Sequence, residues 1–117
     1  MFITSNSLRN NWMVSPKNIF GNTTAVANTL APYYKRNDSE LWILYNDQPP
    51  NRSHRTSKGH TKGVVGASVI EGFWMIHSVP QFPPSSDKYS YAANGVTNGQ
   101  IFLCISLSPK NLNNLGN

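Results

Sequence analysis

Apolar residues gather in four short runs in the second two thirds of the chain. Each run is rich in β-branched or aromatic side chains and is flanked by Gly, Pro, Asn or Asp, which is typical of β-strands. The runs span residues 41–45, 61–69, 73–79 and 100–107. Only residues 70–72 separate the second run from the third, and this short spacing predicts a hairpin.

Helical periodicity is found in one segment near the N-terminus. Residues 22–31 begin with Asn22, a residue type favoured at helix N-caps, and place Val26 and Leu30 four positions apart. Pro32 follows and predicts the end of this helix. Polar composition, prolines and Asn/Gly turn signals predict loops at 51–59, 80–86 and 94–99. The Asn-rich composition from Ser108 onward predicts a frayed tail. The pattern therefore predicts a sheet-dominated α+β fold with one short helix.

The length of 117 residues predicts a single domain, residues 1–117. The first residues lack the apolar stretch and cleavage site of a signal peptide, and no run is long enough to span a membrane, so we expect a soluble chain without membrane contact. Glycosylation sequons at Asn22, Asn37 and Asn51 would matter only on the secretory route.

The net charge of +5 favours an anionic partner. No acidic residue stands between Asp47 and Glu71, whereas four basic residues do: Arg52, Arg55, Lys58 and Lys62. Such a stretch is either a solvated basic loop or a site for a polyanion, and charge alone favours the solvated loop.

Cysteine and histidine are too sparse for a structural metal site. Cys104 is the only cysteine, so no internal disulfide can form, and its apolar surroundings predict a small buried core residue. The three histidines and Cys104 have no metal-ligand spacing, so we expect neither a metal nor another cofactor.

His60 and Lys62 stand two positions apart, which in a strand points both at one target. A neutral imidazole can attack phosphorus, and an ammonium beside it can balance the charge that develops. The departing alkoxide would still need a proton from a second, protonated histidine, for which His54 and His77 are candidates. On its own, a His-x-Lys tripeptide is more often structural or solvent-facing.

Motifs around this tripeptide make it more specific. They read LYNDQPP (44–50), GHTKGVV (59–65), GFWMIHSVPQFPP (72–84), YSY (89–91) and GQIFLCISL (99–107), with a helical segment at 15–34 before them. In this order and spacing they resemble the deoxyribonuclease II family over about residues 12–107, which leaves 108–117 as a polar tail. The resemblance implies an αβ sandwich that forms one half of a phospholipase D-like pseudo-dimer, each half supplying one His-x-Lys. It also implies a lysosomal or secreted acid endonuclease that cleaves DNA without a metal and leaves 3′-phosphate ends.

The same resemblance implies roles for individual residues. His60 matches the catalytic histidine and Lys62 the phosphate-binding lysine. Supporting positions are Asn46, Asp47, Gln48, His77 and Ser78, and DNA binding is expected of Arg52, Arg55 and Lys58. His77 would either orient the catalytic residues through hydrogen bonds or be an ordinary core histidine.

The chain also departs from the family pattern. A second half with its own His-x-Lys and the N-terminal strand region have no counterpart, Ser68 stands where an acid is frequent, and Cys104 matches a cysteine that is normally disulfide-bonded. One hypothesis is a homodimer in which two copies of His60 and Lys62 complete one site, with apolar surface from the Phe73–Met75 segment unless that segment is core. The others are an inactive, truncated relative that binds DNA or another polyanion, and an unstable fragment without function.

Overall fold

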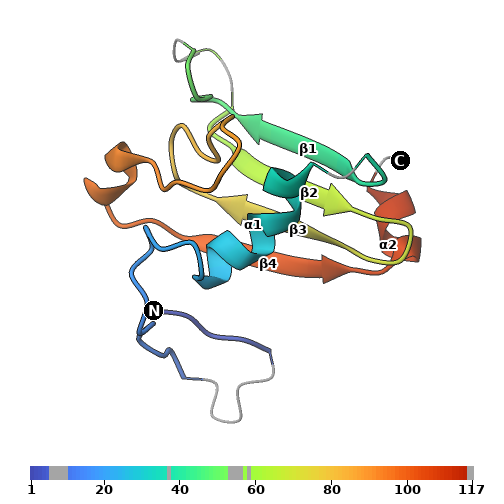
Figure 1. The fold of residues 1–117 in the computed structure, drawn as a ribbon, viewed down its shortest axis with the longest axis horizontal. Coiled ribbons are helices and arrows are strands. Elements are labelled where there is room, and N and C mark those ends of the chain that lie inside the picture. Colours follow the sequence, from blue (N-terminus) through green and yellow to red (C-terminus); the bar gives the residue numbers. More distant parts are fainter. Residues whose placement is uncertain (6–10, 37, 53–56, 58, 116–117) are drawn as a thin grey trace.

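One antiparallel sheet forms the centre of the molecule. The computed structural model describes residues 1–5, 11–36, 38–52, 57 and 59–115. Within them the sheet has four strands in the order β1-β2-β3-β4, and their bounds are Leu41–Asn46, Lys62–Ala67, Gly72–His77 and Phe102–Leu107. Helix α1 (Ala25–Lys35) lies over one face of the sheet, and helix α2 (Pro109–Asn114) lies beyond the end of β4 (Figure 1). A short 3-10 helix, η1 (Ala93–Val96), precedes β4. The α+β class expected from the sequence is therefore confirmed.

All four predicted strands are present, and the predicted hairpin joins β2 to β3. β2 and β4 are shorter than predicted, β1 extends one residue further, to Asn46, and β3 runs from Gly72 to His77 rather than from 73 to 79. Its turn closes with a hydrogen bond from the Ser68 amide to the Glu71 carbonyl at 2.8 Å. The prediction of a frayed tail was wrong, because Ser108 caps helix α2 by accepting a hydrogen bond from the Asn111 amide at 3.4 Å. Pro109 in the first turn of α2 costs no helical hydrogen bond there.

Helix α1 begins and ends later than predicted. Thr24, not Asn22, is its N-cap and accepts a hydrogen bond from the Ala27 amide at 3.2 Å. The helix continues through Pro32 to Lys35. Pro32 removes one helical hydrogen bond, but Leu30 and Tyr34 on either side of it pack against the core, and we attribute the extra turn to that packing.

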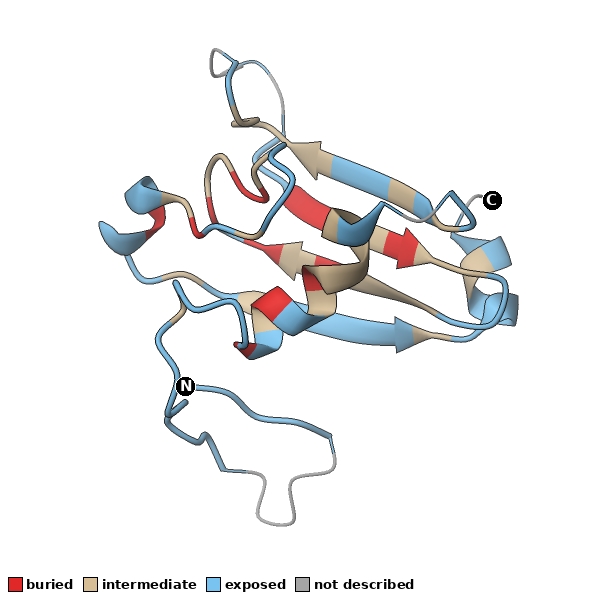
Figure 2. Cartoon of the chain, viewed as in Figure 1, coloured by how far each residue is buried: buried red, intermediate tan, exposed pale blue. Residues whose placement is uncertain are grey.

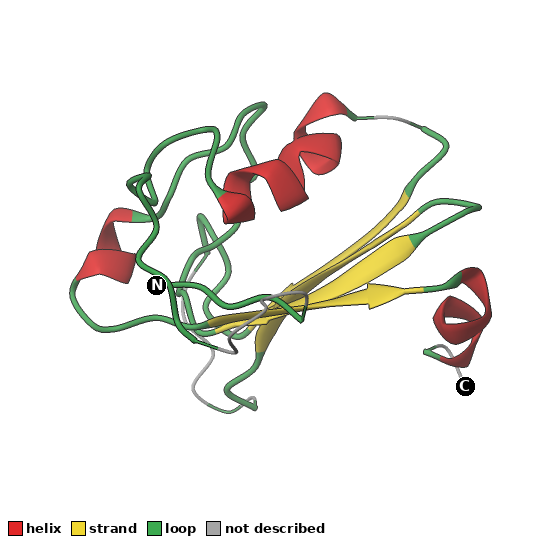
Figure 3. Cartoon of the chain, turned by 90° about the horizontal axis from the view of Figure 1, so that it is seen from below, coloured by secondary structure: helices red, strands yellow, loops and turns green. Residues whose placement is uncertain are grey.

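The strand register divides the side chains between two faces of the sheet. Val64 lies opposite Leu44 and Met75, so these three side chains share one face, which we call the covered face. Helix α1 and the connection between β3 and β4 lie over it (Figure 3). The opposite face, called the open face, carries the side chains of Leu41, Ile43, Tyr45, Val65, Trp74, Leu103 and Ile105.

The hydrophobic core lies between the covered face and the layer above it. Its fully buried members are Leu30 from α1, Val64 and Met75 from the sheet, and Val79 and Phe82 from the connection after β3. Figure 2 shows these buried positions concentrated in α1, β2, β3 and that connection, whereas β1 and β4 are largely exposed.

Gly66 is required on this face because a Cβ there would lie 2.5 Å from the Trp42 ring and 2.8 Å from the Phe73 ring. Of the segment proposed from the sequence as interface or core, Phe73 and Met75 thus belong to the core, and Trp74 lies on the open face.

Cys104 was predicted to be a buried core residue, and this was wrong. It is exposed in β4, the strand at one edge of the sheet. The covering layer buries residues of β2 and β3, so an apolar sequence around Cys104 did not ensure its burial. Within the described residues no helix has the length and hydropathy needed to cross a bilayer.

Candidate functional site

The site is centred on the carboxylate of Asp47. Asp47 directly follows β1, and Lys62 begins β2 opposite Asn46, so the two side chains meet at the same end of neighbouring strands. Asp47 Oδ1 accepts a hydrogen bond from Lys62 Nζ at 2.5 Å, and Asp47 Oδ2 lies 2.6 Å from His60 Nδ1. The structure thus brings His60 and Lys62 to one carboxylate, and we call the three residues the Asp47 trio.

Members of the Asp47 trio differ sharply in exposure. The side chains of Asp47 and Lys62 are 6% and 2% exposed, whereas that of His60 is 77% exposed. Burial by itself raises the pKa of Asp47, but hydrogen bonds from Lys62 and His60 and their charges outweigh it and lower the pKa below its ordinary value. Asp47 is therefore an anion in mildly acidic solution.

This geometry selects one tautomer of a neutral His60. An ionised carboxylate can only accept hydrogen bonds, so Nδ1 of His60 carries the proton and donates it to Asp47. Nε2 is then left with its lone pair, on a ring that is mostly in solvent. A histidine held in this way is arranged for attack on an external electrophile.

Asn46 and Gln48 attach the connection after β3 to the end of β1. The side-chain amide of Asn46 donates to the backbone carbonyls of Phe82 at 3.0 Å and Val79 at 3.4 Å. The side-chain oxygen of Asn46 accepts a hydrogen bond from the backbone N–H of Gln48 at 2.8 Å. The Gln48 carbonyl accepts in turn from the Gln81 amide at 2.8 Å. Both residues flank Asp47 and fix the backbone that positions it.

His77 lies on the covered face as a buried core residue. It is 4% exposed and packs against Phe82 and Phe102, with ring centroids 5.4 Å and 5.8 Å away. Its Nδ1 accepts a hydrogen bond from the Val79 amide at 3.2 Å, and its buried Nε2 has no partner among the described atoms. Burial, and then the charge of Lys62, lower its pKa to about 4. His77 is thus neutral near pH 5, which favours the core alternative over a proton donor.

Ser78 connects strands and does not join the Asp47 trio. Its hydroxyl lies 2.5 Å from the Gln100 side-chain oxygen and accepts from the Ile101 amide at 3.0 Å. These bonds tie the end of β3 to the residues before β4.

The basic loop is described only in part. Arg52 lines a pocket of about 370 Å³ together with Asp47, Gly59 and Thr61. Arg55, Lys58 and His54, which the sequence also put forward, lie outside the described residues. Across the described part of the chain, no group of three or more His, Cys, Asp or Glu side chains is arranged to hold a metal ion.

Sequence reasoning undervalued Asp47. Ser68, at the position where an acid is frequent in the family, suggested that an acid bracing His60 and Lys62 is missing; Ser68 closes the β2–β3 turn at the far end of β2 from His60. Asp47 provides that carboxylate from the residue after the neighbouring strand, β1. The available signal was its place two residues after a predicted strand, as the last acid before the acid-free stretch.

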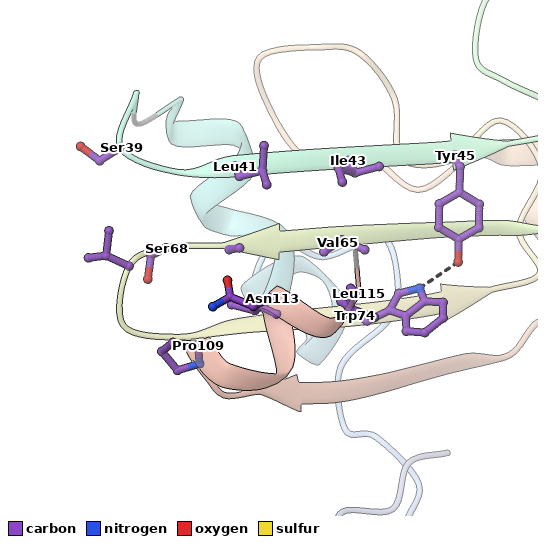
Figure 4. Close-up of a pocket in the computed structure, with 13 residues that line it drawn as sticks. Ser39, Leu41, Ile43, Tyr45, Val65, Ser68, Trp74, Pro109, Asn113 and Leu115 are labelled. Atoms are coloured by element: carbon purple, nitrogen blue, oxygen red, sulfur yellow. Dashed lines mark hydrogen bonds between the residues drawn. The ribbon is translucent and has the colours of Figure 1, made fainter. Parts of the chain in front are cut away.

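Sequence reasoning also missed a larger pocket on the open face. It has a volume of about 590 Å³ and is bounded by Leu41, Ile43, Val65 and Trp74 of the sheet and by Leu112 and Leu115 beside it. Figure 4 shows these mostly apolar side chains between the strands and α2, with the Tyr45–Trp74 hydrogen bond at one end. None of the trio lines this pocket.

Comparison with known proteins agrees on one family. The profile of the family described as Deoxyribonuclease II matches residues 1–117. The chain is 49% identical over 89 residues to Deoxyribonuclease-2-alpha of Mus musculus, which covers 71% of this chain and 25% of that protein. It is 46% identical over 102 residues to the Rattus norvegicus protein of the same name (82% and 29%), and 35% identical over 96 residues to Deoxyribonuclease-2-beta of Homo sapiens (80% and 26%). The matches thus span 25–29% of the length of these relatives.

Proposed function

Because this chain belongs to the deoxyribonuclease II family, we propose that it cleaves DNA phosphodiesters as an acid endonuclease with His60 as the nucleophile. One observation carries the proposal. His60 is exposed, while its Nδ1 is held by a buried carboxylate, so a lone pair on Nε2 is directed away from the protein. A solvated basic loop would not require a buried aspartate behind an exposed histidine.

The chemical sequence has two displacements. Nε2 of His60 attacks the phosphorus, the bond to the 5′ oxygen breaks, and that oxygen takes a proton from a general acid to leave a 5′-hydroxyl. Water then displaces the histidine from phosphorus and leaves a 3′-phosphate. During attack the imidazole becomes positive, and the anionic Asp47 stabilises that charge through the Nδ1 hydrogen bond.

Lys62 contributes a second positive charge. It donates to Asp47, and an ammonium has three N–H donors, so donors remain for a phosphate oxygen that reaches it. Because Lys62 is almost completely buried, we infer that its first task is to keep Asp47 ionised, and that its contact with substrate comes only with closely bound DNA.

The general acid comes from a second half-site. His77 is neutral near pH 5 and buried, so it does not supply the proton. We propose that a second copy of the chain supplies a protonated His60, as the paired lobes of a phospholipase D-like fold do within one polypeptide. One neutral and one charged imidazole coexist most easily near the reference histidine pKa of about 6.5 or slightly below, which suits a lysosomal or other acidic compartment.

A plasmid assay tests the catalytic proposal. Supercoiled plasmid is incubated with the protein at about pH 5 in excess EDTA, beside His60→Ala and the control Lys17→Ala, whose side chain bonds to the Thr23 carbonyl away from the trio. We expect nicking by the parent and the control, a drop of at least about 100-fold for His60→Ala, and 3′-phosphate ends. An equally active His60→Ala protein would contradict the proposal.

Mixing the two proteins tests the shared site. If two copies build one site, adding excess His60→Ala protein lowers parental activity more than dilution does, and sedimentation shows a dimer. Nicking by a monomer, unaffected by mixing, would contradict the homodimer. Salt-sensitive retention of DNA without nicking would support instead a polyanion-binding relative.

A further inference from the structure

The pocket that Arg52 lines includes Asp47 in its wall and has no part in the chemical steps above. Its volume is about 370 Å³, within the size range of small-molecule sites, and its walls include Tyr45, Asp47, Arg52, Gly59 and Thr61. Asp47 belongs both to this wall and to the trio. Anything bound in the pocket therefore lies beside the carboxylate that holds His60.

The charge of the pocket suits an anion. Arg52 is exposed and makes no ion pair with any residue that the structure describes. The carboxylate of Asp47 is already compensated by Lys62 and His60. The guanidinium is thus the uncompensated charge of this wall, and its planar donors suit the paired oxygens of a phosphate group.

Another part of the wall is the aromatic ring of Tyr45. The Tyr45 hydroxyl accepts a hydrogen bond from Trp74 Nε1 at 2.8 Å. The Tyr45 side chain lies over Gly63, where an added Cβ would collide with its hydroxyl and ring. A ring fixed at its hydroxyl end and packed against the backbone loses little further freedom when a ligand packs on it, which favours a flat or apolar group there.

Beside Gly59 the pocket is open. Among the described atoms, none lies within 4 Å of a Cβ added at Gly59, and Thr61, also in the wall, is exposed. Backbone and a hydroxyl group are therefore accessible to a polar ligand close to His60.

We propose that this pocket is a nucleotide subsite next to the scissile phosphate: Arg52 binds the phosphate of one nucleotide, and its sugar or base packs against Tyr45. The assignment rests on the proposed function, because it takes DNA as the substrate class. It adds a position for one unit of the strand, flanking the group that His60 attacks.

Binding of thymidine 3′-phosphate to the full chain, followed by amide chemical shifts, tests the subsite. We expect saturable shifts at Gly59 and Thr61, and a loss of affinity of about 10-fold or more in Arg52→Ala, as for a charge-assisted hydrogen bond. The matched control Arg36→Ala removes an exposed arginine that pairs with Asp87 at 2.7 Å and should bind like the parent. Equal affinity in Arg52→Ala, or shifts confined to other parts of the molecule, would overturn the proposal.

Binding of inorganic phosphate distinguishes the contribution of Arg52 from that of Tyr45. Tyr45→Leu should weaken the nucleotide and leave inorganic phosphate unchanged, whereas Arg52→Ala should weaken both. If inorganic phosphate and the nucleotide bind with the same affinity to the parent, the Tyr45 wall contributes nothing and that half of the proposal fails.

His60→Ala keeps this inference distinct from the catalytic proposal. It should abolish nicking and leave nucleotide binding intact. Nucleotide binding without any nicking by the parent would reject the nuclease and keep the subsite. Nicking that is unaffected by Arg52→Ala would reject the subsite and keep the nuclease.

Discussion

The two faces of the sheet both carry many apolar side chains, but only one of them has a second layer over it. On the covered face, α1 and the connection after β3 bury Val64 and Met75 almost completely. On the open face, Leu41 remains 61% exposed, Ile43 51% and Leu103 55%. Burial in this molecule is therefore set by the presence of a covering element, and the apolar pattern of a strand does not reveal it.

The ionisable groups follow the same division. Lys62 and His77 lie on the covered face, at the end nearest Asp47, where burial makes their charges costly and their hydrogen bonds strong. The open face has an aromatic hydrogen bond, Tyr45 to Trp74, and a mostly apolar pocket. The covered face thus holds Lys62 and His77, whereas the open face, apart from Tyr45 at the wall of the smaller pocket, is apolar surface of the kind that favours association.

The largest effect is expected from breaking the buried ion pair. Asp47→Asn leaves the Lys62 ammonium buried without its counter-charge, and we expect unfolding free energy to fall by about 3–5 kcal/mol in denaturant titration. The double variant Asp47→Asn/Lys62→Met, which removes both charges, should recover most of this loss. If Asp47→Asn alone is as stable as the parent, the pair is not buried as described.

Acid should weaken the covered face through His77. Its pKa is about 4 in the folded chain and near 6.5 when unfolded, so between these pH values only the unfolded chain binds the proton. Stability should therefore fall as pH drops from about 6.5 to about 4, by roughly 2–3 kcal/mol in total, and be nearly constant above that window.

The His77→Phe variant is the control for this titration. Its ring should fit beside Phe82 and Phe102 and flatten the pH profile in that window. Asp47, whose pKa is lowered, adds a further loss only at lower pH, as it becomes protonated. An unchanged profile in His77→Phe would assign the acid sensitivity to other groups.

Adjacent valines on opposite faces give the sharpest test of the comparison. Val64 is fully buried under the covering layer, whereas Val65 is half-buried on the open face. We expect Val64→Ala to cost about 2–3 kcal/mol of unfolding free energy and Val65→Ala less than about 1. If the two variants lose the same unfolding free energy, and the loss for Val65→Ala grows with protein concentration, a second copy of the chain covers the open face in solution.

The smallest change in stability is expected from charging the open face. Ile43→Lys with Leu103→Lys should alter unfolding free energy by less than about 1 kcal/mol and lower light scattering at high concentration. The matched control Val96→Lys places the same charge on an exposed apolar residue outside the sheet, in η1. If light scattering falls only in Val96→Lys, the open face is not the surface through which copies of the chain associate.

Much of the secondary structure could be predicted from the sequence because its signals are local. The four strands follow from short apolar runs bounded by turn residues, and the hairpin follows from the short spacing at 70–72. The extension of α1 past Pro32 could not be predicted in this way. It depends on contacts of Leu30 and Tyr34 with residues that are distant in the sequence.

The candidate site was predicted in part. The spacing of His60 and Lys62 and their motif context identified the pair, but with Ser68 at the position where an acid is frequent, the sequence did not reveal which carboxylate braces it. The strand register decided that Asp47 lies beside them, and register depends on pairing across the sheet. The same holds for Cys104, whose apolar neighbours predicted burial in a strand that forms the edge.

The sequence by itself determined the strands, the basic character of the loop, the His60–Lys62 pair and the family resemblance, since each depends on residues close together along the chain or on their order. The tertiary structure alone decided which face of the sheet is covered, that His77 is a neutral core residue, and that a buried Asp47 holds an exposed His60. Burial and its effect on charge arise from the whole packed molecule, because they depend on how much water the other segments exclude from each group.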